Sequence, residues 1–270
     1  MVISSSDITQ KTYKKLSIQV SLSGLSFCVF DLISNKILNT MSIPFEKNKV
    51  IEEQLWRTFV DYPILTKSYD EVMVVHDNNL NAFVPTSLFD ANFLASYLQY
   101  NTKVFETDFF TYDVVFPYEM NNIYVPFVNI NNFLLDQYET FEYQNANSIL
   151  VKQLLDLSKN KEEKQVFVHV QKEYFELIVV KNQQLILFNS FQYKTPEDFI
   201  YYILFTCEQL QLNPETILVQ ILGNCSEDDA YFKIAFQYIR NCSLLDVTSK
   251  ASILDVTPTA LRNHFILYHS

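Results

Sequence analysis

Three short runs rich in apolar residues, of the kind that forms β-strands, stand near the start of this chain and return in its second half. The first set covers residues 18–22, 27–30 and 37–40, and the second covers residues 166–170, 175–178 and 185–188. A constant shift of 148 positions, which takes residue 18 to residue 166, aligns the two sets without a gap. Such runs predict β-strands, and self-similarity on this scale predicts two domains of one design.

The first set continues in a recognisable order. Turn-forming pairs at residues 23–24 and 34–35 separate its runs, which predicts an antiparallel meander. Helical spacing follows at residues 48–60, with Trp56 on the apolar face. A continuous apolar run at residues 72–75 then has the composition of a buried parallel strand.

The second set repeats this order. Thr195 followed by Pro196 predicts a helix start, and residues 216–222 predict the fourth strand. A meander, a helix and further strands joined by helices make a ribonuclease-H-like unit. Two such units in tandem make the α/β plan of the actin-like ATPase fold, which sugar kinases and heat-shock ATPases share.

The repeat also predicts the domain organisation. Residues 1–15 are expected to be a flexible lead, residues 16–158 the first ribonuclease-H-like domain and residues 165–270 the second. Between the two sets, Pro85 is expected to open a helix whose inner face carries Leu88, Phe89, Phe93, Leu94 and Leu98.

Composition narrows the classes of partner. Of 270 residues, 49% are hydrophobic and 19% are charged, which is enough apolar material for packed cores. The formal net charge of −11 argues against nucleic acid, because proteins that bind it gather Lys and Arg against the phosphates. The sequence contains no uninterrupted run of about 18 apolar residues, so we expect no membrane span.

The cysteines and the N-terminal residues indicate a cytoplasmic protein. The four cysteines are scattered and have no zinc-ligand spacing; they are Cys28, Cys207, Cys225 and Cys242. Residues 1–10 are polar and have no apolar signal core. We therefore expect no metal site and no disulfide framework.

The fold implies a nucleotide-binding site, and the chain meets only part of the requirements for such a site. In the superfamily, two hairpin turns hold the phosphates, an Asp after the first strand positions the metal, and glycines let the backbone approach the ligand. The first turn, residues 21–26, is rich in hydroxyls but lacks the Asp. In the second turn, Lys172 could contact a phosphate, but Glu173 beside it would repel one. Only one glycine follows the fourth strand, where the adenosine would lie and two or more glycines would be expected.

An ordinary hairpin explains each of these turns better than a phosphate site does. The residues that would nevertheless contact a nucleotide are Ser21, Ser23, Gly24, Ser26, Lys172, Gly223 and Asn224. With two glycines in the chain, neither a P-loop nor a G-x-G-x-x-G turn is present.

Other chemistry finds weaker support. A ribonuclease-H-like nuclease needs two or three carboxylates around its first strand, and the equivalent positions hold Ser21 and His169. His76 and Asp77 follow a buried strand, but neighbours on an extended chain point to opposite faces, so they form no catalytic dyad. A hydrolase that uses Asp77 or Asp108 is a remote alternative. We expect no catalytic residue.

Aromatic residues are dense between residues 112 and 143. Part of this set is expected in a core, and the rest can form a surface for a protein partner, because aromatic side chains anchor interfaces. Tyr118, Tyr124, Phe127 and Tyr138 are the candidates for that surface.

Three segments carry a family resemblance. They are residues 16–30 (LSIQVSLSGLSFCVF), residues 124–141 (YVPFVNINNFLLDQYETF) and residues 193–212 (YKTPEDFIYYILFTCEQLQL). They resemble a family of uncharacterised proteins from the Bacteroidetes. The resemblance covers nearly the whole chain and implies an actin-like fold, nearest to pilus-assembly and cell-division members. It implies no activity and adds no catalytic residue.

The sequence therefore favours an actin-like cytoplasmic protein that has degraded nucleotide motifs and works as a non-catalytic protein-binding or scaffold module. The alternative is a protein that binds ATP and Mg²⁺ in the interdomain cleft with weak or no hydrolysis.

Overall fold

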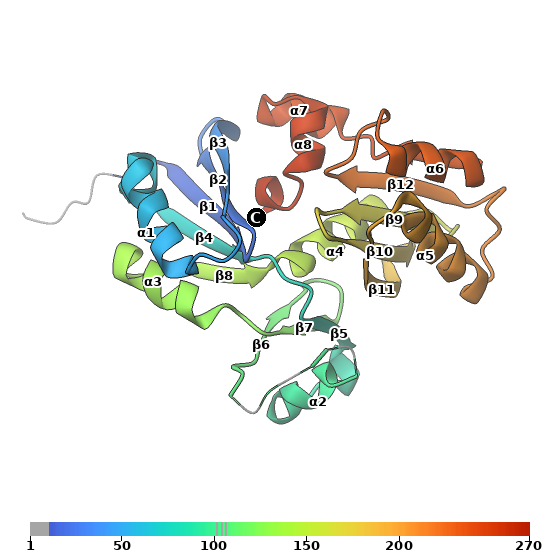
Figure 1. Cartoon of the computed structure of the whole chain (residues 1–270), viewed down its shortest axis with the longest axis horizontal. Helices are drawn as coiled ribbons and strands as arrows, with labels where there is room; N and C mark the ends of the chain where they lie inside the picture. The colour runs from blue at the N-terminus through green and yellow to red at the C-terminus, as the bar shows by residue number, and fades with distance from the viewer. Residues whose placement is uncertain (1–10, 101, 104, 106) are drawn as a thin grey trace, which may run out of the picture. The chain divides into compact units, whose positions relative to one another are not determined.

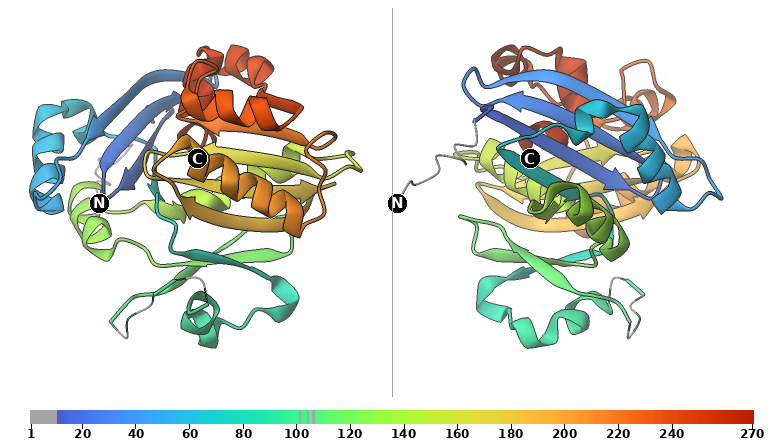
Figure 2. Two further views of the ribbon diagram at one scale, coloured as in Figure 1. Left: turned by 45° about the vertical axis from the view of Figure 1, so that its right-hand side comes forward. Right: turned by 90° about the vertical axis from the view of Figure 1, so that its left-hand side faces the viewer.

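The computed structural model describes residues 11–100, 102–103, 105 and 107–270 (Figures 1 and 2). Unit 1 of the described chain runs to His76 and includes Phe127–Gln144, whereas unit 2 comprises Asp77–Pro126 and Asn145–Ser270. The domain ranges expected from the repeat follow the duplicated segments instead, and they remain a prediction. Of the expected lead, residues 1–10 lie outside the described residues, and Lys14 already begins the first strand.

Unit 1 contains a five-stranded sheet in the order β3-β2-β1-β4-β8. Its strands are β1 (Lys14–Ser21), β2 (Gly24–Asp31), β3 (Lys36–Pro44), β4 (Glu71–His76) and β8 (Glu142–Asn145). The first three are antiparallel, and β4 is parallel to β1. This is the order and direction that the apolar pattern predicts for a ribonuclease-H-like unit.

Helices α1 (Ile51–Asp61) and α3 (Val128–Tyr138) cover one face of this sheet. Alternate β1 residues point into the shared core, where Phe59 of α1 meets Phe133 of α3 with ring centroids 5.2 Å apart. Trp56 is 64% exposed, so its expected place on the apolar face is wrong. The buried face passes through Leu55 and Phe59, and the 100° step of a helix carries the next residue outward. A short 3₁₀ turn, η1 (Pro63–Thr66), leads to β4.

Unit 2 repeats the sheet in the order β11-β10-β9-β12-β13. Its strands are β9 (Gln165–Val170), β10 (Tyr174–Lys181), β11 (Gln184–Gln192), β12 (Leu218–Gly223) and β13 (Asn241–Leu244). The meander of β9 to β11 is antiparallel, and β12 is parallel to β9 and β13.

The two sheets share a fine detail that supports the duplication. The ladder of β2 with β3 is irregular between Val29 and Phe30, and the ladder of β10 with β11 is irregular between Val179 and Val180. These positions are 150 residues apart, not 148. Side chains on a strand alternate between the two faces, so two alignments that differ by two residues place the same side chains on the same face. The apolar pattern of the sequence therefore cannot distinguish a shift of 148 from one of 150.

Helices cover both faces of the second sheet. Helices α5 (Pro196–Gln209) and α6 (Ala230–Tyr238) pack on one face (Figure 2), and α4 (Ala146–Leu157) and α8 (Pro258–Asn263) contact β10 and β12 from the other. Thr195 and Asp198 form a capping box at the start of α5, as expected. The C-terminal part also contains α7 (Thr248–Leu254) and η4 (Leu267–His269). No helix in the described part of the chain is long and apolar enough to cross a bilayer.

A three-stranded antiparallel sheet completes unit 2, in the order β5-β7-β6. Its elements are β5 (Asn81–Pro85), η2 (Thr86–Leu88), η3 (Ala91–Phe93), α2 (Leu94–Leu98), β6 (Thr111–Val114) and β7 (Met120–Tyr124). The expected helix from Pro85 is two 3₁₀ turns and one short α-helix, and Leu88 and Phe93 are exposed. Pro85 instead ends a strand, because its missing N–H suits a sheet edge.

Candidate functional site

The first hairpin turn lies between β1 and β2. The Ser21 hydroxyl accepts a hydrogen bond from the Ser23 backbone N–H at 3.2 Å, donates to the Gly24 carbonyl at 3.2 Å and lies 3.0 Å from the Ser23 hydroxyl. Ser26 lies on β2, two residues after Gly24, and its hydroxyl is 2.8 Å from that of Ser42 on β3. The hydroxyls of this turn therefore bind one another and the hairpin backbone.

Gly24 is required by the sheet itself. A Cβ at this position would lie 2.7 Å from the Ile43 carbonyl oxygen of β3. The close approach of β2 and β3 explains why this position holds a glycine.

The second hairpin turn lies between β9 and β10. The Gln171 N–H donates to the Tyr174 carbonyl at 3.0 Å, and the Gln171 carbonyl accepts from the Tyr193 hydroxyl at 2.6 Å. Lys172 and Glu173 are exposed at its tip. This turn contains no glycine and no run of small residues, and its backbone is held by aromatic neighbours.

Gly223 ends β12 with φ +88. A Cβ here would meet the Val170 carbonyl oxygen at 2.4 Å and the Val170 nitrogen at 2.9 Å. The N–H of the next residue, Asn224, donates to the same Val170 carbonyl at 2.8 Å. The glycine lets β12 turn against the end of β9, so Gly223, Asn224 and the second hairpin do lie together.

A buried acid–base pair next to this hairpin was not expected from the sequence. His169 on β9 and Glu176 on β10 face each other in the ladder, with Nδ1 and Oε2 2.9 Å apart. Burial raises the pKa of Glu176, and the contact with His169 opposes the rise. The signal was available: the two polar residues interrupt apolar strands at positions that an antiparallel hairpin around residues 171–173 brings together.

Asp77 contacts the same hairpin. Its Oδ1 accepts from the Gln171 side-chain amide at 3.1 Å and from the Tyr174 hydroxyl at 3.3 Å. Burial, followed by the Asp77 charge, raises the pKa of Tyr174 well above its usual range. Asp77 thus anchors the chain that enters unit 2.

His76 has a structural role in unit 1. It is fully buried, its Nδ1 accepts from the Phe127 N–H at 3.2 Å, and its ring lies against Phe127 and Tyr143. Burial lowers the pKa of His76 to about 4. The imidazole is neutral at physiological pH and part of the core.

Asp108, a residue of the hydrolase alternative, and the nearby Asp113 also have structural contacts. Asp108 accepts from the Phe105 N–H at 2.8 Å. Asp113 is buried in a polar network, where it accepts from the Asn145 N–H at 2.8 Å, the Tyr124 hydroxyl at 3.1 Å and the Ser148 hydroxyl. Burial raises the pKa of Asp113 to about 6. No group of three or more metal-ligating side chains occurs in the described residues.

The four candidates for a partner surface have different surroundings. Tyr124 is fully buried, which excludes it from any surface. Tyr138 is half-buried and donates to the Leu65 carbonyl at 2.6 Å, and Phe127 packs against the core of unit 1. Tyr118 is hydrogen-bonded to Asp156 and to the Gln183 side chain.

Other aromatic residues between residues 93 and 116 are exposed. They include Phe93, Tyr100, Phe109, Tyr112 and Phe116, which are between 40% and 86% exposed. On β6 and at the residue after it, the exposed Tyr112 and Val114 alternate with the buried Asp113 and Val115. Apolar side chains are usually expected on the buried face of a strand and charged ones on the exposed face. Here the buried Asp113 reverses that expectation, which the sequence pattern alone could not show.

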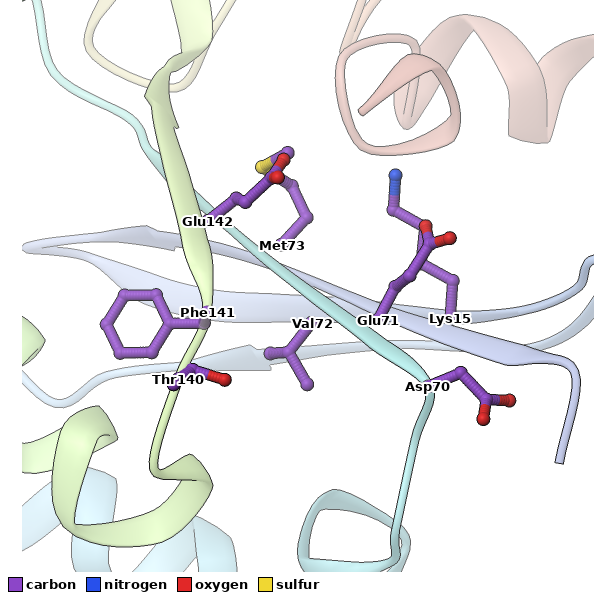
Figure 3. Close-up of a pocket in the computed structure, with 8 residues that line it drawn as sticks. All are labelled: Lys15, Asp70, Glu71, Val72, Met73, Thr140, Phe141 and Glu142. Carbon is purple, nitrogen blue, oxygen red and sulfur yellow. The ribbon is translucent and has the colours of Figure 1, made fainter. Parts of the chain in front are cut away.

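A pocket of about 370 Å³ opens in unit 1 where residues 140–142 separate from the start of β4 (Figure 3). The side chains of Lys15, Glu71 and Glu142 project to the same side of the sheet. Asp70 accepts from the Thr12 hydroxyl at 3.0 Å and the Lys14 N–H at 3.2 Å. The pocket lies at the starts of the parallel strands, whereas ligands in such sheets bind at the opposite ends.

Comparison with known proteins gives a family and a fold. A family model described as protein of unknown function DUF3822 matches residues 3–242. A comparison with curated proteins gave no match.

Solved structures give the fold. A Bacteroides thetaiotaomicron protein of unknown function with an actin-like ATPase fold is 21% identical, with 92% of this chain and 98% of that chain covered and a TM-score of 0.81. The PilM–PilN type IV pilus biogenesis complex has 10% identity, coverage of 94% and 97%, and a TM-score of 0.57. The ethanolamine utilization protein EutJ from Carboxydothermus hydrogenoformans has 7% identity, coverage of 95% and 90%, and a TM-score of 0.51. The expected actin-like ATPase fold is confirmed.

Proposed function

Because the chain belongs to the DUF3822 family of proteins of unknown function and has the actin-like ATPase fold, we propose that it acts by binding another protein and catalyses no reaction. The main observation behind this proposal is that most of the residues expected to contact a nucleotide instead stabilise the hairpins and the sheets. The hydroxyls of the first hairpin turn and both glycines have this structural use. Neither hairpin turn has a carboxylate at the place where the fold would hold Mg²⁺.

Two further observations support a binding role. PilM, which has a similar fold, occurs in a complex with PilN, and that precedent supports a protein partner for this chain. Large apolar side chains on the surface are numerous, and they include the single tryptophan, Trp56. Exposed aromatic residues are typical of interfaces.

We place the protein in the cytoplasm. The four cysteines form no disulfide, and burial raises the pKa of each of them above its usual range. Buried, protonated thiols of this kind suit a reducing compartment.

A thermal-shift titration distinguishes the proposed protein-binding module from the alternative of a nucleotide-binding protein. We expect the melting temperature in about 5 mM ATP with Mg²⁺ to stay within about 0.5 °C of the value in Mg²⁺ alone, with tripolyphosphate as the control for ionic effects. If the dissociation constant for ATP were one hundredth of that concentration, binding would add about 2.7 kcal/mol to the free energy of unfolding and raise the melting temperature by a few degrees.

The opposite outcome has a specific meaning. A saturable rise with ATP that tripolyphosphate does not reproduce would support the alternative of a nucleotide site. The residues to test would then be Ser21, Ser23, Gly24, Ser26, Lys172, Gly223 and Asn224, and Ser23→Ala with Lys172→Ala would be expected to remove the rise.

A further inference from the structure

Two sheets of unit 2 present unpaired edges on either side of one groove. Strand β11 is the outer strand of the five-stranded sheet, and β5 is the outer strand of the three-stranded sheet. In Figures 1 and 2 the two strands lie side by side. A groove of about 290 Å³ between them is lined by Asn81–Pro85, Met120 and residues 185–188.

The lining shows that the groove follows the edges of the strands. Successive side chains of a strand point to opposite faces, so a cavity on one face meets every second residue. This groove meets five consecutive residues of β5 and four consecutive residues of β11. It therefore borders both backbones, whose outward N–H and C=O groups have no partner strand among the described residues.

Neither edge carries a charged side chain, which is one of the usual protections against strand pairing, although the pairing of β11 with β10 is irregular between Val179 and Val180. Natural sheets guard exposed edges with charged side chains or with proline in the strand. Strand β11 reads QLILFNSFQ and β5 reads NAFVP, without a charged residue in either, and Pro85 stands only at the end of β5. Along the groove, Ile186 is 39% exposed, and the rings of Phe83 and Phe188 meet with centroids 4.9 Å apart.

We propose that this groove binds one extended segment of a partner protein, which adds as a β-strand between β5 and β11. Two backbones with unmet hydrogen-bonding groups are complementary to a third extended backbone. The uncharged lining requires an apolar, uncharged segment, because a charged side chain would lose its hydration there. Four lined residues of β11 correspond to about four residues of the partner.

A second copy of this chain suits the groove less well than a separate segment does. Every described strand already belongs to one of the three sheets. A second copy can offer only a sheet edge with its neighbours attached, and a groove flanked on both sides admits one strand.

The proposal rests on the proposed function and names the site and the kind of partner. Peptides selected on the full chain from a random library of about eight residues are the probe. We expect selected peptides to be apolar and uncharged over about four positions. Their binding should slow hydrogen exchange in both β5 and β11.

A matched pair of variants locates the binding. Ile186→Lys places a charge in the groove. Met41→Lys is the control: it places a charge on β3, an edge strand of the five-stranded sheet of unit 1, and both residues are 39% exposed. Ile186→Lys should weaken peptide binding at least about tenfold, and Met41→Lys should leave it within about twofold. Circular dichroism and melting curves establish that both variants are folded.

Backbone methylation distinguishes a strand between two edges from other modes and needs no variant. Alternate N–H groups of an inserted strand point to opposite neighbours. Methylation of either the odd or the even amides should therefore weaken binding, whereas a peptide on one edge would tolerate one of the two sets.

Several results would overturn the proposal. These are the absence of enriched peptides, equal binding to both lysine variants, tolerance of methylation on one set of amides, or a dimer that Ile186→Lys abolishes. An ATP-dependent thermal shift alongside peptide binding would support the alternative of a nucleotide site and leave the groove intact. No ATP shift and no peptide binding would refute the groove alone.

Discussion

At the scale of single residues, the two glycines show how a sequence signal for a ligand can have a structural cause. Both occur where a nucleotide fold needs backbone close to its ligand, Gly24 at a phosphate turn and Gly223 at the adenosine position. In each case, however, a Cβ would collide with a backbone oxygen of a neighbouring strand, Ile43 for Gly24 and Val170 for Gly223. The requirement for glycine at these positions comes from the sheets.

This cause gives a testable cost for Gly223→Ala. The φ of +88 is strained for any side chain, and the new Cβ would lie 2.4 Å from the Val170 carbonyl oxygen. We expect the free energy of unfolding to fall by at least about 2 kcal/mol. Urea denaturation followed by circular dichroism measures the change.

The neighbouring residue supplies the control for that variant. Asn224 is exposed, and Asn224→Ala should alter the free energy of unfolding by no more than about 0.5 kcal/mol. A Gly223→Ala protein as stable as the wild type would show that the close approach to Val170 is not required.

His76 gives a prediction for pH. Its pKa in the folded protein is lowered from 6.5 to about 4 by burial. Between these two values the unfolded chain binds a proton that the folded chain does not, so the free energy of unfolding decreases as the pH falls through this window. The contribution is fully present above pH 6.5 and amounts to about 3 kcal/mol over the whole window.

His76→Gln isolates this contribution because glutamine can accept the Phe127 N–H but does not titrate. Between about pH 7.5 and 4.5, the wild type should lose about 2.5 kcal/mol more than the variant does. Fluorescence of Trp56 during urea denaturation reports on unit 1. The buried Asp113 acts in the opposite direction in both proteins and cancels in the difference. Equal losses in the two proteins would contradict the assignment of a neutral core histidine.

At the scale of elements, the sequence predicts what depends on local pattern and fails where tertiary contacts decide. Both meanders, α1 and α5 lie close to their expected residues. Strand β5 was missed because it is short and ends in Pro85, which also suits a helix start. The burial of Asp113 on β6 was not predictable, because this residue is satisfied by partners far away in sequence, among them Ser148.

At the scale of the whole molecule, the fold was predictable because it occurs twice, and each copy supports the interpretation of the other. The candidate site was less predictable. The sequence locates the turns at residues 21–26 and 171–173, but which hydroxyl or amide each side chain binds depends on packing. The pair of His169 and Glu176 could have been found from hairpin register, whereas the contact of Asp77 with Tyr174 could not.

The charge of the whole molecule leads to a last prediction. With 31 acidic and 20 basic residues, the chain repels a polyanion, and lower salt strengthens this repulsion because screening decreases. The described residues also contain no cluster that would hold the metal ions of a ribonuclease-H-like nuclease. We therefore expect labelled single-stranded DNA and double-stranded RNA to show no anisotropy change up to about 50 µM protein in about 50 mM salt. Both should remain uncut with Mg²⁺ or Mn²⁺. A saturable rise that weakens steeply with salt would reveal a local basic surface that overcomes the net charge, and it would make nucleic acid a partner.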